Sequence, residues 1–311
     1  TLAAALCLLV WLVPLPRPFV LGACFALIGA FLSSTPPFQN AMAMDANRCG
    51  IPVVYGFCRG VGSVSYAAAV LLLGFVLERH APTLLLPVFA ALTACGLIAM
   101  SGFRLPERPD EAADRPAEHR SIAAVLRSHP RFALTLLGCM FFFLTHTISN
   151  TYMNALVGKA GGTASAVGTS LAISAVLELP AMTLVSRLQK RFSPGFFLRF
   201  AAGAEVVKFL IFYLARSMPL IYLGHCMQFF QFAVYAPATV YYVAAALPER
   251  DQLKGQSLIY VAGSGLGGAL GNLLGGRLLD RSGIQAALLL GTVSAAASLL
   301  TFCLSTREDS R

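Results

Sequence analysis

Long apolar stretches recur along the whole chain, and they limit the folds that it can adopt. They cover residues 1–14, 18–38, 53–77, 82–103, 132–157, 164–186, 196–215, 218–247, 256–279 and 283–304. A helix of about 20 residues, rising about 1.5 Å per residue, crosses the hydrocarbon core of a bilayer. Backbone polar groups need partners within the protein in lipid, and these spans are too long for barrel strands. The pattern predicts an all-α polytopic membrane protein with about ten transmembrane helices.

The composition excludes a soluble enzyme. Of the 311 residues, 57% are hydrophobic and only 12% are charged, whereas a soluble domain carries about 25% charged residues. The net charge of +9 comes from 23 Lys and Arg residues that are spread thinly between apolar segments. They do not form the continuous basic face that phosphate binding requires. We therefore expect no nucleic-acid partner and no enzymatic activity, with the lipid bilayer as the surroundings of the chain.

The sequence indicates no cofactor and no metal site. All cysteines except Cys49 lie in apolar segments, and there is no C-x-x-C pair. The segment 263–268 fits the G-x-G-x-x-G pattern, but no strand precedes it, so nucleotide binding is not expected. Gly267, Gly271 and Gly275 instead form small-xxx-small steps, which let a neighbouring helix approach closely and slide.

A charged segment divides the spans into four and six. Residues 104–131 hold six Arg and five acidic residues without an apolar core, which is typical of a solvent linker, with one short amphipathic turn over 121–127. The predicted domains are residues 1–103, the rest of an N-terminal helical bundle; 104–131, the linker; and 132–311, a six-helix bundle. Two-halved transporters have this organisation, and four plus six suggests that two helices are missing from the front.

The distribution of basic residues predicts the orientation of the chain. If the linker is cytoplasmic, alternation of the spans places 15 of the 23 basic residues on the inner side and six on the outer side. An excess of Lys and Arg marks cytoplasmic loops. We therefore expect a multi-pass protein of the cell inner (cytoplasmic) membrane, with the linker and the C-terminus cytoplasmic.

Four ionisable residues lie within apolar spans: Arg59, Glu178, Glu205 and Lys208. Each costs about 2.5–3.5 kcal/mol to place at the bilayer centre, so it needs a reason to be there. Their charges sum to zero, as expected for mutually paired groups in a bundle interior. Glu205 and Lys208 stand at i and i+3 and can neutralise one another locally. Pairing that only fixes helix packing and groups that line a substrate path both remain open.

Polar side chains form stripes at helical spacing on several spans. One face combines a guanidinium with aromatic rings, a suitable chemistry for a polar organic solute; it holds Tyr55, Arg59, Gly62, Ser63 and Tyr66. Two further stripes are Ser170, Ser174 and Glu178, and His146, Asn150 and Asn154, the latter facing inward if the opposite face at Phe141–Phe143 meets lipid. His225 and Gln228 lie one turn apart and can pass hydrogen bonds or a proton.

Four segments, in order, resemble the major facilitator superfamily, in the branch with lactose permease and the nucleoside–proton symporters. The block 55–67 resembles helix five, 177–192 resembles helix eight with its basic turn, 224–229 resembles the His-bearing helix ten, and 254–256 resembles the start of helix eleven. The resemblance covers nearly the whole chain. It implies an N-terminally truncated major facilitator fold in which the ten spans are helices three to twelve of twelve.

The resemblance also implies roles for individual residues. Arg59 would be the substrate-binding arginine, Tyr66 a stacking residue, Glu178 a substrate-binding carboxylate, His225 the link between substrate and proton, and Lys208 the replacement of an arginine that assists deprotonation. The chain departs from the family where Gln228 replaces the helix-ten carboxylate, where Asn40 or a neighbour replaces the helix-four carboxylate, and where the His146–Asn154 stripe replaces helix-seven aspartates.

We predict a secondary active transporter, a proton-coupled symporter of a small polar solute such as a sugar, oligosaccharide or nucleoside, working by alternating access as a monomer. The expected substrate-binding residues are Arg59, Tyr66, Asn40, His146, Asn150 and Glu178, and the expected proton-coupling residues are His225, Gln228, Glu205 and Lys208. A drug/metabolite-type exporter and a non-transporting membrane sensor are the alternatives.

Overall fold

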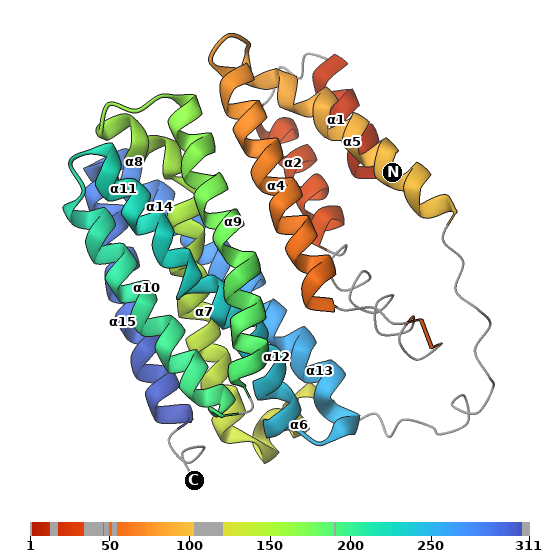
Figure 1. Cartoon of the computed structure of the whole chain (residues 1–311), viewed down its shortest axis with the longest axis vertical. Helices are drawn as coiled ribbons and strands as arrows, with labels where there is room; N and C mark the ends of the chain where they lie inside the picture. The colour runs from red at the N-terminus through yellow and green to blue at the C-terminus, as the bar shows by residue number, and fades with distance from the viewer. Residues whose placement is uncertain are drawn as a thin grey trace. The chain divides into compact units, whose positions relative to one another are not determined.

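The computed structural model consists of helices joined by turns, without a strand, in the residues that it describes. These are 2–12, 18–33, 46, 50–51, 55–102, 121–189 and 191–306, with no side-chain description for 55–60, 186 and 249. This confirms the all-α fold class (Figure 1). The helices are α1 (Leu2–Leu12), α2 (Pro18–Ser33), α4 (Tyr55–Leu77), η1 (Pro82–Leu84), α5 (Leu85–Ser101), α6 (Ile122–Ser128), α7 (Pro130–Thr151), α8 (Met153–Lys159), α9 (Ala164–Leu188), α10 (Pro194–Leu214), α11 (Met218–Cys226), η3 (Met227–Phe229), α12 (Phe232–Ala246), α13 (Glu249–Tyr260), η4 (Val261–Gly267), α14 (Gly268–Ser282) and α15 (Ile284–Ser305).

Six helical stretches in the described part of the chain are long and apolar enough to cross a membrane. They run over Pro82–Ser101, Pro130–Thr151, Ala164–Val185, Met218–Ala246, Arg250–Ser282 and Ile284–Ser305, and three shorter apolar helices cover Leu2–Leu12, Phe19–Leu32 and Val61–Leu77. The 21-residue helix α10 is also long enough to span, but it carries three charged residues, Arg199, Glu205 and Lys208. Many large apolar side chains lie exposed on the surface of the protein, as expected for helices whose outer faces contact lipid.

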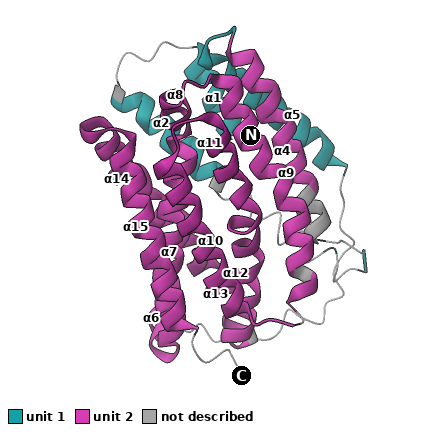
Figure 2. Ribbon diagram, turned by 60° about the vertical axis from the view of Figure 1, so that its left-hand side comes forward, with its two compact units in different colours: residues 1–58, 79–115 teal, residues 59–78, 116–311 magenta. Residues whose placement is uncertain are grey.

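The helices form two compact units (Figure 2): residues 1–58 with 79–115, and residues 59–78 with 116–311. In the first unit, α1 packs against α2 and α5 around Ala3, Cys7 and Ile28. In the second, α7 packs against α15, η4 and α14, and α10 packs against α15 and α12. Helix α6 confirms the helical turn expected near Ser121, whose side chain caps it, while residues 103–120 of the linker lie outside the described residues. The sequence-based domain boundaries stay a prediction.

Most of α4 belongs to the second unit because small residues let it approach α9 closely. Ala67 of α4 and Ala172 and Ala175 of α9 share one buried cluster. At Gly168, a Cβ atom would lie 2.5 Å from the carbonyl oxygen of Val70, so only glycine fits there. This close approach brings Ser63 of α4 within hydrogen-bond distance of Glu178 of α9.

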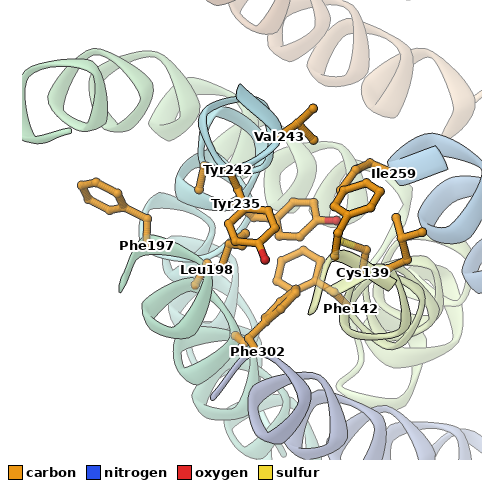
Figure 3. Close-up of a cluster of buried hydrophobic side chains, with 14 of the residues drawn as sticks. Cys139, Phe142, Phe197, Leu198, Tyr235, Tyr242, Val243, Ile259 and Phe302 are labelled. Atoms are coloured by element: carbon orange, nitrogen blue, oxygen red, sulfur yellow. The ribbon is translucent and has the colours of Figure 1, made fainter. Parts of the chain in front are cut away.

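Aromatic rings fill the centre of the second unit. The rings of Phe142 and Tyr235 are stacked with centroids 3.9 Å apart and planes 9° from parallel, and Phe302 packs beside them (Figure 3). The expectation that the Phe141–Phe143 face meets lipid is therefore wrong for Phe142, which is fully buried. Stacking on Tyr235 explains the difference, because α7 is surrounded by other helices and has little surface left for lipid.

The span predicted over 218–247 is interrupted in its middle. Helix α11 gives way to the 3₁₀ turn η3, and α12 begins only at Phe232 after Gln231, whose φ and ψ of −101° and −93° are not helical. The backbone amides of Val234 and Tyr235 donate to the Gln231 carbonyl and restart the helix. Interrupted helices at membrane depth occur where the backbone is buried in protein or lines a polar cavity.

The glycine-rich helix packs closely on α7, as the small-xxx-small pattern predicts. A Cβ at Gly271 would lie 2.6 Å from the carbonyl oxygen of Leu144, and a Cβ at Gly275 would lie 2.6 Å from the Tyr152 ring. Gly267 lies at the end of the π-helical segment η4 and touches the Met140 carbonyl oxygen in the same way. Gly265 has no such neighbour.

We expect Gly267→Ala to destabilise the protein and Gly265→Ala to leave it as stable or slightly more stable. The methyl group at 267 overlaps a backbone oxygen, and overpacking of this kind costs about 1–3 kcal/mol, while alanine favours a helix over glycine by about 1 kcal/mol. Thermal unfolding of both variants in detergent checks this. Equal midpoints for the two variants would show that the contact with α7 is not tight.

Candidate functional site

A chain of three hydrogen bonds crosses the interior of the second unit. Lys208 Nζ of α10 donates to Gln228 Oε1 of η3 at 3.1 Å, and Gln228 Nε2 donates to Glu178 Oε1 of α9 at 3.1 Å. Ser63 Oγ of α4 donates to the other carboxylate oxygen of Glu178 at 2.8 Å. We call Lys208, Gln228, Glu178 and Ser63 the polar relay. It joins four helical elements that come from distant parts of the chain.

The α10 end of the relay is shielded from solvent. Ala201, Glu205, Lys208 and Phe212 share the buried face of this helix, and the side chains of Glu205 and Lys208 are 0% and 1% exposed. The Lys208 ammonium also lies 5.8 Å from the centre of the Phe212 ring, within cation–π range. A buried ammonium needs such partners because it has left water. The hydrogen bond from Lys208 to Gln228 therefore offsets part of the free-energy cost of burying the ammonium.

Gln228 connects the two charges of the relay without bringing them into contact. Its amide oxygen accepts from the Lys208 ammonium, and its amide nitrogen donates to the Glu178 carboxylate. A carboxylate at position 228 could accept from Lys208 but, when ionised, could not donate to Glu178. The replacement of the family's helix-ten carboxylate by glutamine thus suits this arrangement.

The predicted local pairing of Glu205 with Lys208 is not a hydrogen-bonded pair. Neither carboxylate oxygen of Glu205 has a hydrogen-bond partner in the structure, while Lys208 is directed to Gln228. The two charges still interact electrostatically across one turn of α10. The interior position of η3 explains the difference, because it offers Lys208 an acceptor on a facing element, which sequence spacing along one helix does not reveal.

His225 contacts a different residue of the α9 stripe. Ser174 Oγ lies 2.7 Å from His225 Nδ1, and the imidazole is tilted against the Phe212 ring with centroids 5.1 Å apart. His225 is buried, and its Nε2 atom has no hydrogen-bond partner in the structure. The serines and carboxylate of the stripe therefore do different things: Ser174 holds His225, Glu178 joins the relay, and Ser170 donates to the backbone oxygen of Ala166.

His146 and Asn150 form a second polar cluster on α7. Asn150 Nδ2 lies 3.1 Å from His146 Nε2 and donates to the His146 carbonyl oxygen at 2.9 Å. The imidazole is stacked on Phe232 with centroids 4.5 Å apart and planes 8° from parallel. Asn150 and Asn154 are exposed in this structure. The stripe thus offers two exposed amides and one imidazole fixed by an aromatic ring.

Two of the predicted site residues lie outside the described side chains, and a third is half exposed beside the relay. Arg59 lies on α4, but its side chain is outside the described residues, and so is all of Asn40. Tyr66 is on α4, 51% exposed, with its phenol within electrostatic reach of Glu178. Tyr66 therefore presents an open ring face near the relay. The other predicted residues lie on α7, α9, α10, α11 and η3 as described above.

Two residues absent from the predicted site belong to this region. Ser63 shares a helical face with Arg59 and Tyr66, so the stripe on α4 already marked it, and its bond to Glu178 makes it a member of the relay. Gln231 is fully buried three residues after Gln228, and neither end of its amide has a hydrogen-bond partner in the structure. Its spacing from Gln228 was the signal that could have identified it.

The chemistry of the relay suits a neutral, hydroxyl-rich molecule. Ammonium and amide groups donate, while carboxylate and amide oxygens accept, so hydroxyl groups can be bound in both directions. No group of His, Cys, Asp and Glu suited to a metal ion occurs among the described residues. Binding here would proceed by exchange of hydrogen bonds.

Sequence comparison relates nearly all of the chain to known transporters. A family model described as "MFS_1 like family" matches residues 1–290. Maltose permease of Geobacillus stearothermophilus is 28% identical over 286 residues, which are 91% of this chain and 71% of the permease. The uncharacterized transporter YwbF of Bacillus subtilis (strain 168) is 23% identical over 297 residues, 95% of this chain and 72% of that protein.

Solved structures show the same fold. A point variant of the nucleoside transporter NupG superposes with a TM-score of 0.70 at 16% identity, over 98% of this chain and 80% of that one. FucP, a major facilitator superfamily transporter in the outward conformation, gives a TM-score of 0.52 at 19% identity, over 74% of this chain and 59% of that one. At these identities, the likeness concerns the fold alone.

We expect Lys208→Met to destabilise the protein, and Glu205→Gln to restore part of the loss when it is added. Removing one member of a buried charge set costs about 3–5 kcal/mol, because the remaining charge is uncompensated. The double variant removes one positive and one negative charge and so keeps the interior balanced. Thermal unfolding of the two single variants and the double variant measures the interaction. Simple addition of the two single effects would contradict it.

Proposed function

The chain belongs to the MFS_1 like family, within the major facilitator superfamily of membrane transporters, and on this premise we propose that it is a proton-coupled symporter of a sugar or oligosaccharide. Because this superfamily consists of transporters, the expectation that the chain is not an enzyme is confirmed. The chain is a multi-pass membrane protein, as its apolar helices and its family both indicate.

The polar relay is the observation that carries this proposal. Buried polar groups within transmembrane helices are costly, and they mark the paths of solutes and ions. The relay places a carboxylate, an amide and a hydroxyl on three facing elements, which are the groups that bind sugar hydroxyls. The similarity of most of the chain to a maltose permease supports a sugar as the substrate class.

Alternating access would expose this relay to each side of the membrane in turn, by rocking of two helical bundles. Glu178 has the central role in our proposal because it is bonded on both sides, to Ser63 and to Gln228. A sugar hydroxyl that replaces Ser63 as a donor to Glu178 would loosen the link between α4 and α9. Substrate binding would then be coupled to movement of α4 through a hydrogen bond that forms or breaks.

A nucleoside is the second candidate substrate, and Tyr66 is the observation that favours it. Its ring is half exposed and lies close to Glu178, so a base could stack on it while the ribose hydroxyls meet the carboxylate. The fold similarity to the nucleoside transporter NupG is compatible with either substrate. Binding of a sugar would use the relay alone, whereas binding of a nucleoside would use both the relay and the ring of Tyr66.

We expect the protein, reconstituted in proteoliposomes with an inward proton gradient, to accumulate one member of a labelled panel of maltose, other oligosaccharides and nucleosides. Glu178→Gln should reduce its initial uptake about 10- to 100-fold, since a hydrogen bond to a charged group contributes about 1.5–3 kcal/mol. Asp280→Asn, the same carboxyl-to-amide change on an exposed residue near the end of α14, is the matched control.

Each outcome of the panel identifies something different. Accumulation of a nucleoside that Tyr66→Ala reduces, with Tyr66→Phe intact, would replace the sugar by the second candidate. Binding without accumulation would favour a sensor. Uptake in Glu178→Gln equal to that of the control variant would contradict the proposed site.

We further propose that the protein lies in the cytoplasmic membrane as a monomer, with the 104–131 linker and the C-terminus in the cytoplasm. The excess of basic residues on the linker side supports this orientation. An epitope tag inserted after Ala112 should be labelled only in permeabilised cells, and a tag after Ala160 also in intact cells. The reverse pattern would require the opposite orientation.

A further inference from the structure

Glu205 and Gln231 are two fully buried polar side chains that the relay does not use. Both are 0% exposed, and all four of their terminal polar atoms lack a hydrogen-bond partner in the structure. Most buried polar groups in proteins are hydrogen-bonded, so an unsatisfied set needs an explanation. A buried carboxylate is the more costly of the two, because it carries a charge when ionised.

The packing of α10 places these two residues at the same level. Helix α10 and the interrupted helix α11–η3–α12 pack against each other, and their contacts follow an antiparallel register. Phe212 touches Gly224, Lys208 is bonded to Gln228, and Ala201 shares a core cluster with Tyr235. Each step toward the N-terminus of α10 is therefore matched by an equal step toward the C-terminus of the α11–η3–α12 helix. In this register, Glu205 lies level with Gln231.

A glutamine amide is a suitable partner for a carboxyl group that gains and loses a proton. Its N–H donates to the ionised carboxylate, and its oxygen accepts from the protonated acid. One side chain can therefore satisfy both forms with only a change of rotamer. Because Gln231 lies two residues after the end of η3 and immediately before α12, it stands at the interruption of the helix, where its own φ and ψ are not helical.

We propose that Glu205 binds the transported proton and that Gln231 is the positioning residue, whose amide is not bonded to Glu205 in this structure and pairs with its carboxyl group during transport; the proposal rests on the proposed symport and assigns its proton site. The proton arrives from the aqueous side, is bound to a carboxylate oxygen of Glu205, and leaves to the other side, with no other bond made or broken.

The surroundings of Glu205 distinguish it from the other candidates. Glu178 already accepts two hydrogen bonds, and Gln228 cannot titrate. His225 is held by Ser174 at Nδ1. Besides Glu205, the titratable and charged groups on α10 and on the elements packed against it are Arg199, Lys208 and Tyr213 on α10, Tyr222, His225 and Cys226 on α11, Tyr235, Tyr241 and Tyr242 on α12, Arg131, Cys139 and His146 on α7, and Cys303 on α15. Glu205 is the sole carboxyl group of this set.

Lys208 links the proton site to the substrate site. It interacts electrostatically with Glu205 and with Glu178, and it is hydrogen-bonded to Gln228. When Glu205 takes up a proton, Lys208 loses the counter-charge on its own helix and is attracted more strongly toward the relay. Protonation therefore strengthens the relay at the Glu178 end, and deprotonation weakens it. Binding of the proton at Glu205 and binding of the substrate at the relay would therefore influence each other through the charge of Lys208.

The first experiment compares accumulation with exchange in proteoliposomes, using the compound that the panel identifies. At a gradient of one pH unit, a carrier with one proton per substrate accumulates about tenfold, since each pH unit is a tenfold ratio. In Glu205→Gln we expect the accumulation ratio to fall to about one, the value of an uncoupled carrier, while exchange continues. Gln231→Leu should lower the ratio, and Asp280→Asn, a carboxyl-to-amide control on an exposed residue of α14, should keep it.

The second experiment needs no substrate, so it separates failure of this proposal from failure of the proposed function. A pH-difference infrared spectrum of the purified protein should contain the carbonyl band of a protonated, buried carboxyl group. That band should vanish in Glu205→Gln and shift to higher frequency in Gln231→Leu, where its hydrogen-bond partner is gone. A shift of this band is a readout that mere loss of packing would not produce.

Loss of the band and of accumulation in Glu205→Gln supports the assignment, and loss of the band supports it even if the panel finds no transported compound. A band that survives Glu205→Gln, or full accumulation in that variant, overturns the assignment of the proton to Glu205. An unchanged band in Gln231→Leu overturns the positioning role of Gln231.

Discussion

The hydrogen bond from Lys208 to Gln228 is the interaction on which the interior of the second unit depends, because a fully buried ammonium has few alternatives. In water it would be solvated; within an apolar bundle it needs acceptors and counter-charges supplied by facing helices. Gln228 supplies the acceptor and passes the interaction on to Glu178, and through Glu178 to Ser63 of α4. One cation thereby fixes the relative positions of four elements.

Such a relay requires helices that approach one another closely. Gly168 brings α4 against α9, and Gly271 brings the glycine-rich helix against the backbone of α7. Without an aqueous hydrophobic effect between helices, close contact through small residues is a main source of cohesion in a membrane. Glu205 and Gln231 are fully buried as well, in the region where α10 packs against α12 and η3.

The helical periodicity of polar residues and the free-energy cost of placing a charge in lipid explain which parts of the site could be predicted from the sequence. A charged residue in an apolar span is conspicuous, so Glu178, Glu205 and Lys208 could be selected from the sequence. Their hydrogen-bond partners could not be selected in this way. A spacing of three residues indicated that Glu205 can neutralise Lys208, with which it does interact electrostatically, but it did not reveal the hydrogen bond from Lys208 to Gln228. Gln231 was overlooked because an uncharged amide among phenylalanines costs less than a charge and stands out less.

The sequence by itself determined that this chain is a helical membrane protein of a transporter family, where its helices run, and which ionisable groups need a function. These properties follow from local composition and from the length needed to cross a bilayer. Only the tertiary structure decided that α11 and α12 are separated at Gln231, that Phe142 is buried against Tyr235, and that Ser63 reaches Glu178. The physical reason is that partners in a helical bundle come from facing helices, and their register depends on side-chain packing between elements that are distant in sequence.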